Sequence, residues 1–131
     1  FGGATPLMYA ALKGKQETAA LLLAAGARAD ATDTVGWTPL HFAARQTDGA
    51  VLRLLVRLLT DRRETVDLPD NGGTTPLMIA AAHDNAEAVR ILLYVGADPS
   101  LTDRTGRDAR GYAALKNAES ALSALEARDV P

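Results

Sequence analysis

The chain has 131 residues, enough for one ordinary domain, of which 47% are hydrophobic and 23% charged. It contains no cysteine, which excludes disulfides and thiolate metal sites. Its net charge of −2 leaves no strongly basic field to hold a nucleic acid. The longest apolar stretch, residues 19–25, is far too short to span a bilayer. We therefore expect one folded domain that binds no nucleic acid and does not insert into a membrane.

The tripeptide Thr-Pro-Leu occurs three times, at residues 5–7, 38–40 and 75–77. A degraded copy at 108–113 begins with Asp in place of Thr. The first and last intervals between these starts are equal, and the middle interval is longer. A period of about 33 residues indicates stacked helix pairs rather than a single globular core. Such a solenoid presents an extended surface, which favours binding another macromolecule over catalysis.

The third copy carries the clearest helix signals. Thr75 is a good N-cap residue, because its hydroxyl can accept a hydrogen bond from a first-turn amide. Pro76 fits the first helical position, where no backbone donor is needed. Residues 84–85 should break this helix and start a second one near 86–95, and Gly96 should end that second helix in a left-handed conformation. The unit is therefore predicted to be a helix pair.

Residues 36–44 read Gly-Trp-Thr-Pro-Leu-His-Phe-Ala-Ala, and residues 92–98 read Leu-Leu-Tyr-Val-Gly-Ala-Asp. Recurring in phase over essentially the whole chain, these patterns resemble the ankyrin repeat. The resemblance implies an all-α fold, an ankyrin-repeat solenoid of stacked antiparallel helix pairs linked by β-hairpin-like turns. It implies a single ankyrin-repeat domain over residues 1–131, with repeats at approximately 5–37, 38–74, 75–107 and 108–131.

The second unit is four residues longer than the others, with the extra residues near 60–63 and without the usual Gly-Ala-Asp stop. Because four residues make about one helical turn, its second helix is predicted to run one turn further, to about Arg62. The extra residues are either a tolerated insertion in an exposed loop or a protruding helix end. In the second case the cations Arg57, Arg62 and Arg63 would be available to a partner.

The fourth unit has the character of a terminal capping repeat. Residues 112–116 are identical to residues 9–13 of the first unit. Its second helix, expected at roughly 119–128, alternates small and charged residues and lacks a Leu-Leu pair. A capping repeat turns one face to water, so we expect the array to end here.

The first unit differs in the opposite direction, with the apolar run 21–23 in its second helix. It has Thr18 and Ala19 where the third unit has Ala88 and Val89, so we expect weaker packing. Since Phe1 falls inside an inter-repeat turn, we also expect another repeat or a polar cap to precede it.

Histidines are the first candidates for chemistry. The resemblance implies that His41 bonds to its own helix start and to a neighbouring turn, which is a structural role. His83 is expected at the exposed end of a first helix. These two histidines lie in different repeats and there is no cysteine, so a metal cluster is not expected. No Ser/His/Asp arrangement is recognisable, so we predict no catalysis, no cofactor and no metal.

The turns between units share the pattern Asp-x-x-Gly, at 33–36, 70–73 and 103–106. Repetition in register predicts side chain to backbone bonding inside each turn rather than metal ligation. The glycine-rich run 71–74 lacks the Lys-Ser/Thr of a phosphate-binding loop. A hairpin turn is the better prediction, because Asn-Gly supplies the positive φ values that a tight turn needs.

In ankyrin repeats, partners usually engage the concave face made of hairpin tips and the exposed side of the first helices. Trp37 with Arg45 and Arg107 is the expected anchor group, because aromatic and arginine residues dominate binding hot spots. Alternatively, Trp37 packs on an adjacent hairpin as part of the framework. Carried over by position, the expected contact residues are Lys13, Thr34, Val35, Trp37, Arg45, Gln46, Asn71, Thr74, Ala82, His83, Arg104, Thr105, Arg107 and Lys116.

The function this implies is a protein-protein interaction module that binds a protein or peptide. The expected face is rich in cations, so an acidic peptide would suit it. Tyr9, Phe42, Ile79 and Tyr112 are expected to line the helix stack instead. The alternatives are a regulatory or targeting domain of a larger enzyme or channel, and a self-associating structural module. We expect a cytoplasmic or nuclear protein that is monomeric or part of a longer chain.

Overall fold

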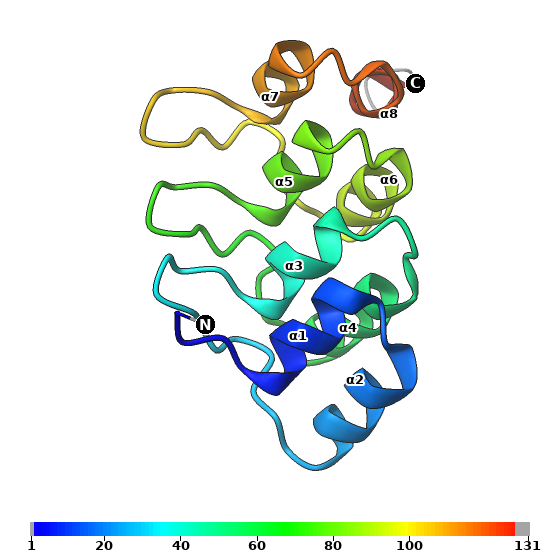
Figure 1. Cartoon of the computed structure of the whole chain (residues 1–131). Coiled ribbons are helices and arrows are strands. Elements are labelled where there is room, and N and C mark those ends of the chain that lie inside the picture. The colour runs from blue at the N-terminus through cyan, green and yellow to red at the C-terminus, as the bar shows by residue number, and fades with distance from the viewer. Residues whose placement is uncertain (1, 128–131) are drawn as a thin grey trace.

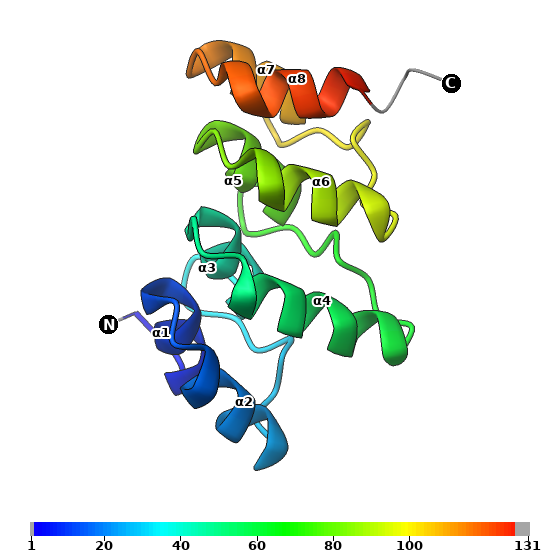
Figure 2. The ribbon, with the colours of Figure 1, turned by 90° about the vertical axis from the view of Figure 1, so that its right-hand side faces the viewer.

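A computed structural model describes residues 2–127, which form eight α-helices in antiparallel pairs and contain no β-strand. Figure 1 shows the pairs stacked from α1 and α2 at the bottom to α7 and α8 at the top. The inner row is α1 (Pro6–Lys13), α3 (Pro39–Arg45), α5 (Pro76–Ala82) and α7 (Ala109–Leu115). The outer row, which faces the viewer in Figure 2, is α2 (Gln16–Ala24), α4 (Ala50–Asp61), α6 (Ala86–Tyr94) and α8 (Glu119–Ala127). This is the all-helical solenoid that the sequence predicts.

Each inner helix begins at a capped residue followed by proline or alanine. The hydroxyl oxygens of Thr5, Thr38 and Thr75 each accept a hydrogen bond from the amide three residues on. In the fourth pair the carboxylate of Asp108 accepts from the amide of Gly111, at 2.8 Å. The recurring tripeptide is therefore a helix start, and it works because the cap satisfies an amide that has no partner within the helix.

The core runs along the stack between the two rows of helices. Leucines of the repeated tripeptide are buried in all three copies, and the alanines four positions further on are fully buried. Alanine lets neighbouring inner helices approach closely, so α1 packs on α3, α3 on α5 and α5 on α7. The buried leucines are Leu7, Leu40 and Leu77, and the fully buried alanines are Ala11, Ala44 and Ala81.

Hairpin-shaped loops connect the pairs and project to the left in Figure 1. In each loop the aspartate Oδ1 atom accepts hydrogen bonds from the amides two and four residues on, at 2.8–3.0 Å. Successive loops also bond to one another, as from the amide of Asn71 to the carbonyl of Val35 at 3.0 Å. Gly36 has φ +85°, and a Cβ there would lie 2.8 Å from the amide nitrogen of Asn71. The Asp-x-x-Gly pattern is thus framework, as the sequence predicts.

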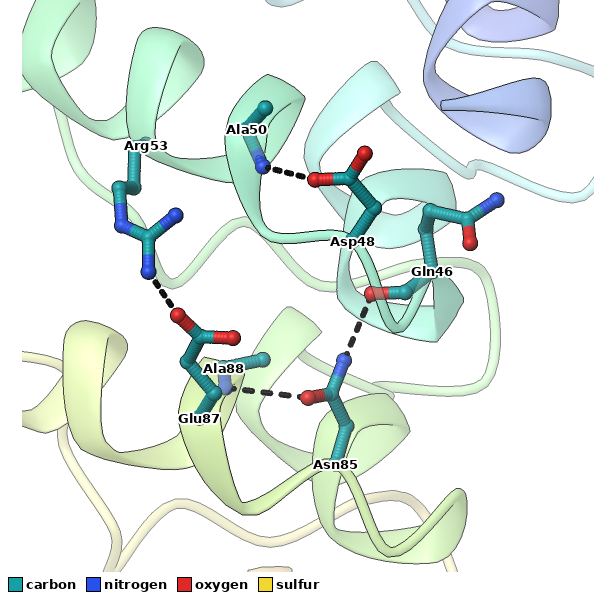
Figure 3. Close-up of polar contacts among 7 residues, drawn as sticks. All are labelled: Gln46, Asp48, Ala50, Arg53, Asn85, Glu87 and Ala88. Carbon is teal, nitrogen blue, oxygen red and sulfur yellow. Dashed lines mark hydrogen bonds and ion pairs between the residues drawn. The ribbon is translucent and has the colours of Figure 1, made fainter. Parts of the chain in front are cut away.

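Asparagine and aspartate side chains connect the third pair to its neighbours, and Figure 3 shows the contact of Asn85 with Gln46. The buried Asn85 side chain donates to the carbonyls of Ala44 and Gln46, at 3.0 and 2.9 Å, and accepts from the amide of Ala88. The Asp84 carboxylate accepts from the amide of Ala121 in the next pair, at 2.8 Å. These bonds satisfy helix ends across repeats, so the order of the stack is enforced by polar contacts as well as by apolar packing.

The outer helix of the second pair is the longest helix within the described residues. α4 has twelve residues, whereas α2, α6 and α8 have nine each, and Arg62 is its C-cap residue. The expected extra turn ending near Arg62 is confirmed. Arg63 follows with φ +58°, where the first and third pairs have glycine, Gly26 at +95° and Gly96 at +100°. An arginine therefore takes up the left-handed conformation that glycine adopts at the other helix ends.

The outer helices of the two end pairs differ in how much they bury. α2 buries only Ala19, and Leu21 is 72% exposed. α8 buries Ala121, Ala124 and Leu125. The expected end of this last helix at Arg128 lies outside the described residues.

Candidate functional site

The residues expected to contact a partner lie on hairpin loops and at the ends of inner helices, which we call the hairpin face. The loop members are Thr34, Val35, Trp37, Asn71, Thr74, Arg104, Thr105 and Arg107, and the helix-end members are Lys13, Arg45, Gln46, Ala82, His83 and Lys116. Trp37, Gln46, Thr74, Ala82 and Arg107 are half-buried, and the others are exposed. A partner approaching the loops and inner helices would therefore meet most of this set.

The main apolar feature of the hairpin face is a hollow of about 300 Å³ between α1, the residues just before it and the first hairpin loop, at residues 33–37. We call it the Tyr9 hollow. Its wall combines expected residues with others that sequence reasoning missed. Thr34, Val35 and Trp37 were expected, and Met8, Tyr9, Leu12 and Phe42 were not.

Tyr9 does not line the helix stack as expected, because its side chain is 53% exposed. The equivalent Phe42 is half-buried, since the Trp37 ring packs edge-on against it with 4.9 Å between centroids. In the first pair the position of Trp37 is held by Ala4, which is too small to cover Tyr9. This alanine, one repeat before the tryptophan, was the signal in the sequence that could have revealed the open aromatic ring.

Trp37 belongs to both the framework and the hollow. Its indole N–H donates to Oδ2 of Asp70 in the next loop at 3.0 Å, and its ring stacks on His41 with 5.6 Å between centroids. The remaining surface of the half-buried ring lines the Tyr9 hollow. The two roles proposed from sequence are thus combined, since the hydrogen bond to Asp70 holds the ring in place as one wall.

Cations lie over three aromatic rings of the hairpin face. The Lys13 ammonium is 5.7 Å from the Tyr9 ring centroid, and the Arg45 guanidinium is 5.9 Å from that of Trp37. Arg107 lies over Tyr112 in the fourth pair, at 5.5 Å. Arg45 is therefore next to Trp37, as the expected anchor group requires, whereas Arg107 is engaged with a different ring.

His41 is fully buried and structural. Its Nδ1 atom accepts from the Thr38 amide at 3.0 Å, so Nε2 carries the proton and donates to the Thr74 carbonyl of the next loop at 2.9 Å. Burial lowers the pKa of His41, which keeps the ring neutral. Exposed His83 lies with its Nδ1 atom 2.9 Å from the Ile79 carbonyl of its own helix. The framework role expected for His41 is confirmed.

Several polar residues expected on the hairpin face are committed to bonds within the protein. The side-chain amide of Gln46 donates to the carbonyl of Leu12, and the side-chain amide of Asn71 donates to the carbonyl of Thr34. Asp103 accepts hydrogen bonds from the hydroxyls of Thr105 and Tyr112, and these hold the pKa of its carboxyl well below the usual range. The side chains of Gln46, Asn71 and Thr105 therefore build the face more than they offer free groups.

Within residues 2–127, no three His, Cys, Asp or Glu side chains are close enough together to hold a metal ion. No helix in the same range combines the length and apolar character that a membrane crossing needs.

Comparison with known proteins agrees with the repeat geometry. A family model described as ankyrin repeats (3 copies) matches residues 2–58 and 54–127. Human Rabankyrin-5 is 44% identical over 54 residues, which cover 41% of this chain and 5% of that protein. The chain thus spans only a small fraction of this relative. Ankyrin repeats are in general protein-interaction modules and typically not catalytic. With matches over nearly all described residues, the chain belongs to the ankyrin repeat family.

Proposed function

We propose that this chain binds a peptide segment of a partner protein on the hairpin face and catalyses no reaction. The observation that carries the proposal is the Tyr9 hollow, in which two exposed apolar side chains border a half-buried tryptophan. Tyr9 and Val35 are each 53% exposed and line the same hollow, and adjoining exposed apolar groups of this kind mark interaction sites. Aromatic rings in a concave setting are also typical of binding hot spots.

The charge around the hollow defines the peptide we propose. Lys13 and Arg45 lie over the two aromatic rings and are exposed at its rim. A peptide with an aliphatic or aromatic side chain next to Asp or Glu would fill the hollow and pair with these cations. We also propose that this binding takes place in the cytoplasm or nucleus, as the family resemblance implies.

The test is selection of short peptides from a displayed library, followed by fluorescence anisotropy on the purified protein. Val35→Asp should weaken the selected peptides about 10-fold or more, because it replaces an apolar contact by a charge. Leu101→Asp is the matched control, since Leu101 is 37% exposed on a loop that does not line the hollow. Selection of no peptide, or equal losses from both variants, would contradict the proposal.

A further inference from the structure

A second groove lies in the outer row of helices, between α4 and α6. Figure 2 shows these two helices side by side in the middle of that row, on the other side of the inner helices from the hairpin loops of Figure 1. The groove encloses about 570 Å³. The Tyr9 hollow, by comparison, has a volume of about 300 Å³. The side chains used below are Arg53, Arg57 and Asp61 of α4 and Arg90, Ile91 and Tyr94 of α6.

Within the outer helices of residues 2–127, the cations are confined to this groove. The segments of α2 and α8 contain no lysine or arginine, whereas α4 carries Arg53 and Arg57 and α6 carries Arg90. One repeat before the two α4 arginines, the same positions hold Ala20 and Ala24. Because the whole chain has a net charge of −2, this positive patch is a local feature rather than the general character of the surface.

Most of this positive charge is not neutralised inside the protein. Arg53 pairs with Glu87 across the two helices, as Figure 3 shows. Arg57 and Arg90 form no ion pair with any residue in 2–127. Asp61 is the one carboxylate among the described residues of the wall, so two guanidinium groups face a single acid. A guanidinium offers paired donors in a geometry that matches a carboxylate.

The groove also has an apolar part that stands in solvent. Tyr94 is 92% exposed, the highest value among the large hydrophobic residues of the described chain. Ile91 is half-buried beside it, one turn earlier on α6. The extra turn of α4 extends the opposite wall as far as Asp61. Tyrosine and arginine together are the residues most enriched where binding energy concentrates.

We propose that the α4–α6 groove is a second docking surface, which binds an acidic peptide segment of a partner protein. Carboxylates of the peptide pair with Arg57 and Arg90, and an apolar side chain packs on Tyr94 and Ile91. A second copy of this chain fits less well, because a symmetric contact would bring the same arginines together. The proposal is independent of binding at the hairpin face, since the two surfaces share no residue.

The experiment uses two displayed libraries of short peptides, one rich in Asp and Glu and a matched one in which Asn and Gln replace them. We expect enrichment from the acidic library only. Among the selected peptides, those that do not depend on the Tyr9 hollow should lose affinity about 30-fold for the Arg57→Glu/Arg90→Glu variant and about 10-fold for Tyr94→Ala. Both variants should retain the urea midpoint of the wild type, because all three side chains are exposed.

Two substitutions on the hairpin face serve as controls. Arg104→Glu removes an exposed cation outside the groove and should leave affinity unchanged, as should Val35→Asp in the Tyr9 hollow. Equal enrichment from both libraries would overturn the proposal. So would a selection in which every binder is insensitive to the Arg57→Glu/Arg90→Glu change and lost with Val35→Asp, because all of them then occupy the hairpin face. Concentration-dependent self-association that the double substitution abolishes would also overturn it, in favour of an interface between copies.

Discussion

The outer helices α2 and α4 occupy the same place in successive repeats and differ sharply in how much they bury. α2 buries one residue, Ala19, whereas α4 buries Val51, Leu52, Leu55, Val56 and Leu59. α4 packs between α2 and α6, while α2 contacts only α4 in the outer row of the described residues. The burial of a leucine in this repeat array therefore depends on its neighbours, and we expect the first pair to be less stable than the middle of the array.

The same difference in burial is found when identical residues at equivalent positions of the first two repeats are compared. Leu22 and Leu55 hold the same position in successive repeats, and Leu55 is fully buried while Leu22 is half-buried. Pro6 is exposed, and its counterpart Pro39 is fully buried. The residue type is the same within each of these two pairs, so the difference in burial arises from packing alone.

The largest effect should come from truncating the buried leucine of the middle. Leu55→Ala should lower the free energy of unfolding by about 3 kcal/mol, since it removes buried methyl groups and leaves a cavity. Leu22→Ala should cost about 1 kcal/mol or less, because water already reaches that side chain. Urea denaturation followed by circular dichroism measures both. Equal losses for the two variants would refute the packing difference between α2 and α4.

The hydrogen bond from His41 to the Thr74 carbonyl connects the second repeat to the third, whereas within residues 2–127 the first repeat has no equivalent bond to the second. At the joint between the first two repeats, the equivalent of His41 is Met8, whose sulfur accepts from the Thr5 amide of its own repeat. His41→Ala should lower the free energy of unfolding by about 2 kcal/mol, because it leaves the buried Thr38 amide without its partner and removes the bond to the Thr74 carbonyl, which keeps only the one from the Asp70 amide. His83→Ala, on the exposed side chain, is the matched control and should change little. Urea denaturation measures both variants, and equal losses would count against the joint.

The pH dependence of stability follows from the lowered pKa of the same histidine. The unfolded chain takes up a proton at the ordinary pKa of about 6.5, while the folded protein resists protonation. Stability should therefore be fully present above this pH and decline as the pH falls below it. His41→Ala should flatten the decline between about pH 7 and pH 5. An unchanged slope would show that other groups govern stability in this range.

The smallest effect concerns the end of the long helix. Arg63→Gly should raise the free energy of unfolding by up to about 1 kcal/mol, because glycine adopts a positive φ without steric cost. Gly26→Ala at the end of α2 is the opposite change, and open space around Gly26 means that only backbone conformation opposes it. Thermal melts of the two variants should move in opposite directions. Destabilisation by Arg63→Gly would mean that the arginine side chain contributes more than the backbone loses.

Much of the fold could be predicted because its signals are local. Threonine followed by proline caps a helix through its own next amides, and an aspartate closes a turn through amides two and four residues away. Four extra residues lengthened α4 because they continue a regular helix until a left-handed residue ends it. The candidate site was less predictable. Thr34, Val35 and Trp37 were named from position, but Tyr9 was assigned to the stack, because that assignment did not take into account the small Ala4, which leaves the Tyr9 ring uncovered.

The sequence by itself thus determined the repeats, their helix starts and ends, and the framework role of His41, since each follows from short-range bonding that recurs in register. The tertiary structure alone decided which faces stay open. The partner of Trp37 lies in the next repeat, the Tyr9 hollow is bounded on one side by Val35 and Trp37 of the second repeat, and the α4–α6 groove joins arginines from two repeats. Contacts across repeats depend on the sizes of side chains far apart in the sequence, and a local pattern contains no record of them.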